Sequence, residues 1–273
     1  MLMKRLNRLK FWRKWVFWKT ILGWKDYICA HCINRELVPL HDKLNAIMKE
    51  QVQDWPHLVY CGGYYYQGLL EIGINGIKPS EKRLERYGIH EYLKPEKSVL
   101  DIGSNAGFFA CHLSKYVKSV DGVELNPYLI RISNEVKSYL SLANVNFHEA
   151  DFTSFTSDEQ YGFVFSLSNH HTIDGNLDMN FEEYISKIFD LLEPGGFLFF
   201  ESHNIYGDDS DLEKKFLICS KYYELIKYKM IKAFYRPDID KLFAIFHKKE
   251  QITDAQKTVF SLESAQYRYE YYL

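Results

Sequence analysis

Residues 99–109 read VLDIGSNAGFF, and this stretch decides the fold. An apolar run ends in the carboxylate of Asp101 and turns through Gly103 and Gly107 into a helix that we expect over 107–116. Glycine adopts backbone conformations closed to other residues and lets a ligand approach the main chain. The same pattern opens dinucleotide-binding domains. Because those domains tolerate an alanine at the position of Ala110, spacing alone does not exclude a nicotinamide enzyme.

Strand and helix patterns alternate on both sides of this stretch. The expected strands are 98–102, 119–124, 144–148, 163–167 and 197–201, and the expected helices are 107–116, 127–140 and 181–192. Strands separated by helices of this length predict a parallel sheet with helices on both faces, a doubly wound α/β fold. The segments 222–230 and 242–248 also have strand character, and they predict an antiparallel pair that closes one edge.

Two acidic positions follow the next strands in the series. Glu124 ends the second strand, 21 residues after Gly103, where a carboxylate can accept hydrogen bonds from both ribose hydroxyls of an adenosine ligand. Asp151 and Phe152 follow the third strand, where the acid can accept from an adenine amino group and the ring can pack on the base. The alternatives are a turn residue at 151 and a solvated strand end at 124.

Five motifs together resemble the class I S-adenosylmethionine-dependent methyltransferases, in that family's order and at its spacing. They are VLDIGSNAGFFA at 99–110, VDGVEL at 120–125, EADF at 149–152, FVFSLSNHHTID at 163–174 and LLEPGGFLFFES at 191–202. The resemblance covers about 155 residues and implies a Rossmann-like sheet of seven strands with a final antiparallel hairpin. The Pro194-Gly195-Gly196 turn favours methyl transfer over the nicotinamide alternative.

The resemblance also implies which residues contact the cofactor S-adenosylmethionine. Asp101, Gly103 and Gly107 fall near its methionine and ribose part, Glu124 on the ribose, and Asp151 and Phe152 around the adenine. The full predicted set is Asp101, Gly103, Ser104, Asn105, Gly107, Phe108, Glu124, Leu125, Asp151, Phe152 and Ser168. Asn105 stands where the family usually has the middle glycine of the loop. No metal site is predicted.

Histidines follow two strands on the side where the acceptor should bind. Ligands of open α/β sheets bind outside the carboxyl ends of the strands, so the segment 168–172 should face the reacting methyl group. A histidine can remove a hydroxyl proton near neutral pH. His171 or His170 is therefore the predicted base, and His203 after the fifth strand is a further candidate. The alternative is that these histidines are structural.

Composition and charge limit the remaining function classes. The chain has 273 residues, 47% of them hydrophobic, and a net charge of −2, which is ordinary for a globular protein and argues against nucleic acid as a partner. Five cysteines are few and odd in number, which indicates a reducing, cytoplasmic compartment rather than a disulfide framework. No apolar run is long enough to predict a transmembrane helix.

Residues 1–25 carry eight basic residues, no acidic residue and four of the five tryptophans. Phe11, Trp15, Trp18 and Leu22 fall on one face of a helix. Lysines and arginines interrupt any signal-peptide core. We expect either a helix that lies on an anionic membrane, on the inner face of the cytoplasmic membrane, or one that packs on the domain or on a protein partner.

The chain therefore divides into four expected parts. They are a basic aromatic amphipathic helix over 1–25, a lead-in or cap over 26–95, a cofactor-binding catalytic domain over 96–250 and a tail over 251–273. In the lead-in, Cys29 and Cys32 have the spacing of a metal or redox pair but lack regularly spaced further ligands. Ser80 is the expected N-cap of a helix. Lys82 and Arg83 are candidates to hold a cofactor carboxylate or an acceptor phosphate, with a solvated helix face as the alternative.

The predicted function is methyl transfer to an oxygen of a small-molecule or glycan acceptor, including a lipid-linked one. Residues 76–109 resemble methyltransferases of bacterial surface-glycan and other specialised pathways, and residues 221–249 resemble more faintly the end of the methyltransferase part of O-antigen chain-terminating enzymes. The alternatives are an RNA methyltransferase that holds phosphates with its basic N-terminus and a non-catalytic scaffold that keeps the cofactor fold.

Overall fold

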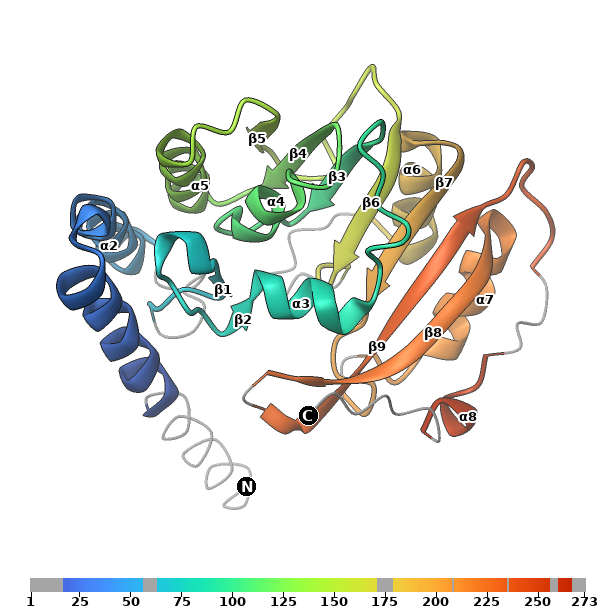
Figure 1. Cartoon of the computed structure of the whole chain (residues 1–273). Coiled ribbons are helices and arrows are strands. Elements are labelled where there is room, and N and C mark those ends of the chain that lie inside the picture. The colour runs from blue at the N-terminus through green and yellow to red at the C-terminus, as the bar shows by residue number, and fades with distance from the viewer. Residues whose placement is uncertain are drawn as a thin grey trace.

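A single seven-stranded sheet dominates the computed structural model (Figure 1), which describes residues 17–55, 63–170, 179–207, 209–234, 236–255 and 260–266. The strands are β3 (Ser98–Ile102), β4 (Ser119–Glu124), β5 (Val145–Glu149), β6 (Tyr161–Leu167), β7 (Leu192–Glu201), β8 (Tyr223–Ala233) and β9 (Arg236–Lys248). Their spatial order is β5-β4-β3-β6-β7-β9-β8. This confirms the predicted doubly wound, Rossmann-like α/β class.

The strand directions create the point at which ligands bind in such sheets. Strands β3 to β7 are parallel, and β9 runs antiparallel to both β7 and β8. The order of the parallel strands reverses between β3 and β6, which places a crevice at the carboxyl ends of these strands. Strand β7 begins five residues before the expected start because the chain passes from helix α6 (Phe181–Leu191) directly into the sheet.

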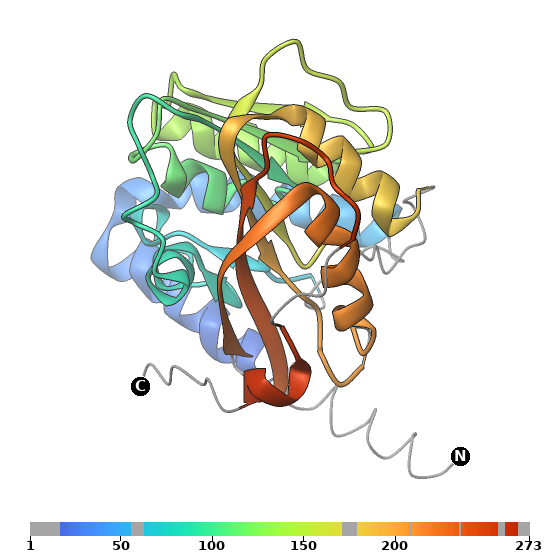
Figure 2. The ribbon, with the colours of Figure 1, turned by 90° about the vertical axis from the view of Figure 1, so that its right-hand side faces the viewer.

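Alternating side chains bury both faces of the sheet. Leu100, Val164 and Phe200 point to the face covered by α6 and α7 (Leu212–Tyr222), with α8 (Leu262–Gln266) nearby. Val99, Phe165 and Phe199 point to the opposite face, against α3 (Ser80–Tyr87) and α4 (Phe108–Leu113). This alternation follows from the two-residue period of a strand. Figure 2 shows the two helix layers on either side of the sheet.

The lead-in forms a third apolar cluster on top of α4 and α5 (Pro127–Tyr139). It contains the elements η1 (Cys29–Ile33), η2 (Arg35–Leu37), α2 (Val38–Asp54), β1 (Gln67–Gly68), η5 (Leu70–Ile72) and β2 (Lys78–Pro79). Buried Asp26 ties these pieces together, because its carboxylate accepts hydrogen bonds from the Tyr64 hydroxyl (2.5 Å) and from the backbone N–H of Asn75 (2.9 Å). The lead-in is thus packed against the sheet domain beside the crevice.

The helix over residues 17–28 precedes η1 and lies next to α2 (Figure 1). Its inner face buries Leu22, which is 1% exposed and belongs to the lead-in cluster. Phe17 and Trp24 lie outside that face and are 58% and 63% exposed. Phe11 and Trp15 of the predicted apolar face lie outside the described residues. Among the residues that the structure describes, no helix is both long and apolar enough to span a membrane.

Ser80 and the pair Cys29 and Cys32 are the local features of the lead-in for which the sequence suggested a role. Ser80 is not an N-cap, since α3 begins at Ser80 itself and Pro79 occupies the cap position. Cys29 is half-buried against Gly73 and Cys32 is exposed. Within the described ranges, no group of three or more histidine, cysteine or acidic side chains is arranged to hold a metal ion.

Candidate active site

The glycine-rich loop between β3 and α4 lies at the centre of the crevice. Three of its residues have left-handed backbone angles: φ is 65° at Gly103, 54° at Asn105 and 70° at Gly107. Asparagine adopts this conformation more readily than most residues other than glycine. This explains how Asn105 can replace the glycine that the resembling family usually carries.

Position 107 must also be glycine because there is no space for a side chain there. A Cβ atom on Gly107 would lie 2.5 Å from both the Phe147 ring and the Cβ atom of Ser133. On Gly103 it would lie 3.1 Å from the Cβ atom of Asn169. The loop therefore keeps its main chain bare where β3 ends and α4 begins.

The side chain of Gln67 in β1 connects the lead-in to this loop through hydrogen bonds. Its Oε1 atom accepts from the backbone N–H of Phe108 (2.9 Å), at the start of α4, where helical N–H groups have no partner within the helix. Its Nε2 atom donates to the carbonyl of Ser104 (3.1 Å). No sequence motif identifies Gln67, because it lies about 40 residues before the loop in a segment without a recognisable pattern.

Glu124 stands beside the same loop at the end of β4. Its Oε2 atom accepts from the backbone N–H of Asn105 (2.9 Å), and its Oε1 atom accepts from that of Asn126 (3.0 Å). Asn126 in turn caps α5 through its side chain. Glu124 and Leu125 are half-buried, so Glu124 stays partly exposed while main-chain donors fix its carboxylate.

Two buried polar atoms, one near the end of β3 and one in the loop, make no hydrogen bond with any described residue. They are Oδ2 of Asp101 and Oγ of Ser104, on side chains that are 3% and 0% exposed as whole residues. Burial raises the pKa of Asp101 to about 7, against the opposing effect of the Arg83 charge. Buried polar atoms normally have partners. These two fit a site that a polar ligand completes.

At the end of β5, Asp151 and Phe152 make contacts within the protein itself. The Oδ1 atom of Asp151 accepts from the backbone N–H of Thr153 (2.8 Å), which closes a turn after β5. Phe152 is 6% exposed, packs edge-on against Tyr184 at 5.3 Å and lies under the ammonium of Lys187. Asp151 thus closes a turn after β5, the strand end where the sequence motifs predict the adenine.

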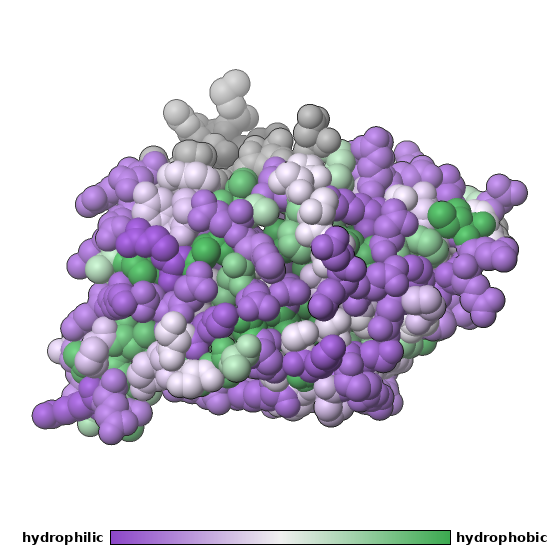
Figure 3. Space-filling view, turned by 90° about the horizontal axis from the view of Figure 1, so that it is seen from above, coloured by the Kyte–Doolittle hydropathy of each residue, from purple (hydrophilic) through white to green (hydrophobic). Residues whose placement is uncertain are grey.

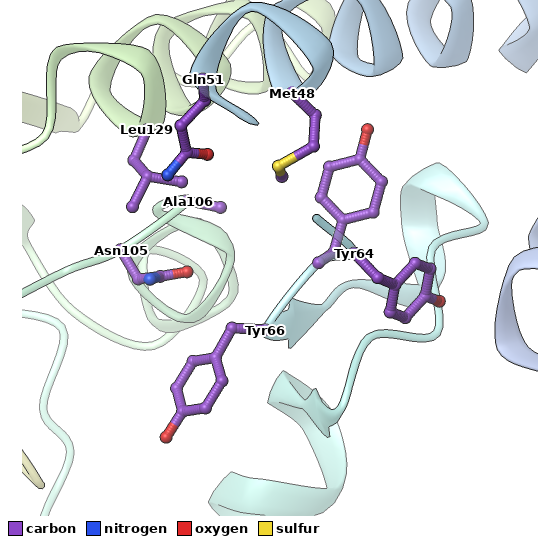
Figure 4. Close-up of a pocket in the computed structure, with 8 residues that line it drawn as sticks. Met48, Gln51, Tyr64, Tyr66, Asn105, Ala106 and Leu129 are labelled. Carbon is purple, nitrogen blue, oxygen red and sulfur yellow. The ribbon is translucent and has the colours of Figure 1, made fainter. Parts of the chain in front are cut away.

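A cleft opens between the lead-in and the glycine loop (Figure 4). It is lined by Met48, Gln51, Tyr64, Tyr65, Tyr66, Asn105, Ala106 and Leu129. Residues of α2 and the tyrosine segment lie on one side, and the loop and the start of α5 lie on the other. Viewed from above, the molecular surface is mainly hydrophilic with small apolar patches between the polar groups (Figure 3).

The predicted acceptor side lies after β6. Asn169 donates to the carbonyl of Ile102 and so joins this segment to the end of β3. The side chain of His170 is fully buried, and its Nε2 atom lies 3.0 Å from Oδ1 of Asp209. Lys215 pairs with the same carboxylate, so His170 belongs to an internal ion cluster. His171 lies outside the described residues.

His203 is half-buried, whereas the side chain of His170 is enclosed, and the Nε2 atom of His203 is itself buried. Burial and the neighbouring charge of His170 lower the pKa of His203 to about 3. Its imidazole is therefore neutral at physiological pH, and a pKa this low makes it a weak base. Its backbone N–H donates to Oδ2 of Asp209 (2.5 Å), which ties both histidines to one acid.

A buried cluster of charges forms at the end of β7, and no sequence motif predicts it. Glu201, the last residue of β7, is paired with Lys78, Arg83 and Lys241. Burial would raise the pKa of Glu201, but these three cations hold it well below its usual value. Arg83 is 3% exposed, whereas its neighbour Lys82 is exposed. Of the two residues predicted as candidates to bind a carboxylate or phosphate, only Arg83 lies in the buried cluster, and Lys82 lies on the exposed helix face.

Comparison with known proteins gives a family and a fold. Residues 93–257 match a family described as a methyltransferase domain. A putative methyltransferase of Geobacillus sp. is 25% identical over 131 residues, 47% of this chain and 50% of that protein. A carboxy-S-adenosyl-L-methionine synthase of Desulfotalea psychrophila is 27% identical over 134 residues, 47% of this chain and 53% of that protein. The chain thus spans about half the length of these curated relatives.

Among solved structures, the N-methyltransferase NodS of Bradyrhizobium japonicum in complex with S-adenosyl-L-homocysteine shares the fold. The TM-score is 0.51, the sequence identity is 18%, and the match covers 63% of this chain and 89% of that one. At this identity the likeness concerns the arrangement of helices and strands.

Proposed function

The chain belongs to the methyltransferase-domain family, and from that premise we propose that it transfers a methyl group from S-adenosylmethionine to an oxygen of a small-molecule or glycan acceptor. The enzyme class predicted from the sequence motifs, an S-adenosylmethionine-dependent methyltransferase, is confirmed by the family match. We propose the kind of acceptor and the roles of the individual residues. The catalytic domain is taken as 96–250, with 26–95 as its cap and 251–273 as a tail.

One observation carries the proposal. The carboxylate of Asp101, the glycine-rich loop and the carboxylate of Glu124 come together at the switch point of the sheet, where the strand order reverses between β3 and β6. Glu124 touches the loop through the Asn105 N–H, and Asp101 and Ser104 present buried polar atoms beside it. An adenosine with an amino-acid tail offers hydroxyl, amino and carboxylate groups for such a surface. We assign the ribose to Glu124, the amino-acid part to Asp101 and Gly103, and the adenine to the neighbourhood of Asp151 and Phe152.

The remaining chemistry falls to positioning and to proton removal. S-adenosylmethionine supplies a methyl group that is already activated by the sulfonium charge. The protein must hold the acceptor oxygen in line and take its proton when needed. We assign proton acceptance to His203 or to His171. His203 is a weak base at its low pKa, and in this assignment it takes the proton as the new methyl–oxygen bond makes the hydroxyl acidic. His170 is held by Asp209 and supports the backbone around His203.

The experiment that tests this function uses a labelled methyl donor. The full chain is incubated with isotopically labelled S-adenosylmethionine and separate extracts of polar metabolites, lipid-linked glycans and RNA. Mass spectrometry should find a labelled methyl on an oxygen of a small or glycan product. Label confined to RNA, or to nitrogen or carbon, would contradict the proposed acceptor. Cofactor binding without any labelled product would support a scaffold role instead.

We also propose that residues 1–25 attach the enzyme to an anionic membrane surface. The outer face of the described helix exposes Phe17, Trp24, Tyr27 and Ile28, which lie at helical spacing. Residues 1–25 carry eight basic residues and no acidic one. Rings enter the headgroup layer, and each basic residue near an anionic surface contributes about 1 kcal/mol. This would place the enzyme on the inner face of the cytoplasmic membrane, near lipid-linked acceptors.

Vesicle cosedimentation tests the membrane proposal. The full chain should sediment increasingly with rising anionic lipid content and be released by salt. Replacing Trp24 by Ser should weaken sedimentation, whereas replacing exposed Leu217 on α7 by Ser should not. If the chain stays in the supernatant with anionic vesicles at low salt, the exposed face must serve a protein interface.

A further inference from the structure

Four charged side chains at the carboxyl end of β7 are almost completely buried. Side-chain exposure is 4% for Glu201 and Arg83, 7% for Lys78 and 10% for Lys241. The ammonium groups of Lys78 and Lys241 both lie 3.0 Å from Oε1 of Glu201, and Nη2 of Arg83 lies 3.6 Å from it. Three cations therefore share one oxygen of one carboxylate.

Hydrogen-bond donors exceed acceptors in this cluster. Oε1 of Glu201 also accepts from the hydroxyl of Ser168 (2.5 Å), and Oε2 accepts from Tyr87. Both carboxylate oxygens are thus engaged, while Nη2 of Arg83 donates no hydrogen bond to any described residue. Isolated buried charge is costly unless it is paired.

The cluster also holds more positive than negative charges, just as it holds more hydrogen-bond donors than acceptors. Lys78, Arg83 and Lys241 oppose Glu201, and the charge of Arg83 also acts on Asp101. With Lys78, Arg83 and Lys241 all ionised, one positive charge remains uncompensated in the cluster even when Asp101 is ionised. Burial lowers the pKa of Lys78 and of Lys241, and a bound anion would favour their charged forms. A ligand that brings one negative charge would neutralise the cluster and accept its surplus hydrogen bonds.

The cluster is connected to the cleft. The ammonium of Lys78 lies 4.8 Å from the ring centre of Tyr66, which lines the cleft beside Asn105. On the other side, the ammonium of Lys241 donates to the hydroxyl of Ser168 (2.6 Å). Ser168 is half-buried and precedes Asn169, which joins the end of β3. The cations thus lie between the cleft and the predicted acceptor segment.

We propose that Lys78, Arg83 and Lys241 form an anion subsite that binds a carboxylate or phosphate group of the methyl acceptor. The proposal deepens the proposed function and rests on it. The assignment to the acceptor follows from the strand order, since Glu124 ends β4 and Glu201 ends β7, with β3 and β6 between them. Strands about 4.8 Å apart separate these ends by roughly 14 Å. The ribose end of the cofactor and the cluster therefore occupy opposite sides of the switch point.

Inorganic phosphate is the probe, titrated into the full chain at constant ionic strength with and without saturating S-adenosylhomocysteine. Calorimetry should show saturable phosphate binding that persists when S-adenosylhomocysteine is bound. Lys241→Met removes one charge-assisted donor and should weaken phosphate binding about tenfold or more. Lys82→Met, an exposed cation on the same helix as Arg83, should leave phosphate binding unchanged.

A second variant covers the case in which Lys241→Met does not fold. Glu201→Gln removes the carboxylate that pairs with all three cations and enlarges the positive surplus, so phosphate should bind more tightly than in the wild type. Three results overturn the proposal: no saturable binding, equal weakening in Lys241→Met and Lys82→Met, or competition between phosphate and S-adenosylhomocysteine. The last would assign the cations to the cofactor. Failure of S-adenosylhomocysteine itself to bind would instead contradict the proposed function, and phosphate binding in its absence remains measurable.

Discussion

Replacement of Glu124 by Ala should weaken cofactor binding without unfolding the sheet. The carboxylate accepts from the backbone N–H groups of Asn105 (2.9 Å) and Asn126 (3.0 Å) and is assigned to the ribose hydroxyls. Leaving those hydroxyls unpaired costs about 1–3 kcal/mol. At about 1.4 kcal/mol per factor of ten, the affinity for S-adenosylhomocysteine should fall by roughly fivefold to 150-fold.

Calorimetry of S-adenosylhomocysteine binding measures this loss, with two matched variants. Glu124→Gln keeps one acceptor oxygen but loses the charge, so its affinity should lie between those of the wild type and Glu124→Ala. Glu149→Ala removes an exposed acid at the end of the neighbouring strand, directly across from Glu124, and should bind normally. Unchanged affinity in Glu124→Ala, or equal losses in Glu124→Ala and Glu149→Ala, would refute the ribose assignment.

Further predictions concern the other residues of the crevice. His203→Ala should lower turnover about 10²-fold with little change in cofactor affinity, measured by steady-state kinetics once an acceptor is known; a normal rate would move the base to His171. His170→Ala should instead lower the free energy of unfolding by about 3 kcal/mol in urea titrations, because it breaks a buried ion cluster; unchanged stability would contradict its structural role. The pKa of Asp101 is about 7 in the folded chain against 3.8 ordinarily, so its contribution to stability is complete below about pH 4 and is lost as the pH rises towards 7. Asp101→Asn should therefore raise the free energy of unfolding at pH 8 by up to about 4 kcal/mol and have little effect at pH 4; a gain independent of pH would show that Asp101 does not titrate in this range. Gly103→Ala should lower the free energy of unfolding by about 1–2 kcal/mol because of its left-handed φ, and a variant as stable as the wild type would contradict that conformation.

The sequence was informative where local patterns determine structure. The strand, glycine turn and helix around Asp101 are local features, and alternating strands and helices leave few topologies open. The seven-stranded sheet and its final hairpin were therefore predictable. The helical character of 17–25 was predictable for the same reason, whereas the burial of Leu22 depends on the lead-in cluster that covers it.

The candidate site was less predictable because its contacts join distant segments. Lys78 meets Glu201 across 123 positions, and Gln67 reaches the start of α4 across about 40. Neither residue belongs to a motif. The burial of His170 depends on Asp209, 39 residues later, so the neighbouring histidines at 170 and 171 could not be distinguished from local sequence. Ser80 resembled an N-cap, but the preceding Pro79 takes that position.

A crystal structure of the full chain with S-adenosylhomocysteine tests the central claim most directly. The ribose hydroxyls should lie within hydrogen-bonding distance of the Glu124 carboxylate, and the amino-acid part should lie over Gly103 beside Asp101. The buried Oδ2 atom of Asp101 or Oγ atom of Ser104 should gain a hydrogen bond from the ligand or from a water that the ligand orders. A ligand bound elsewhere, or one whose ribose lies away from the end of β4, would contradict the account.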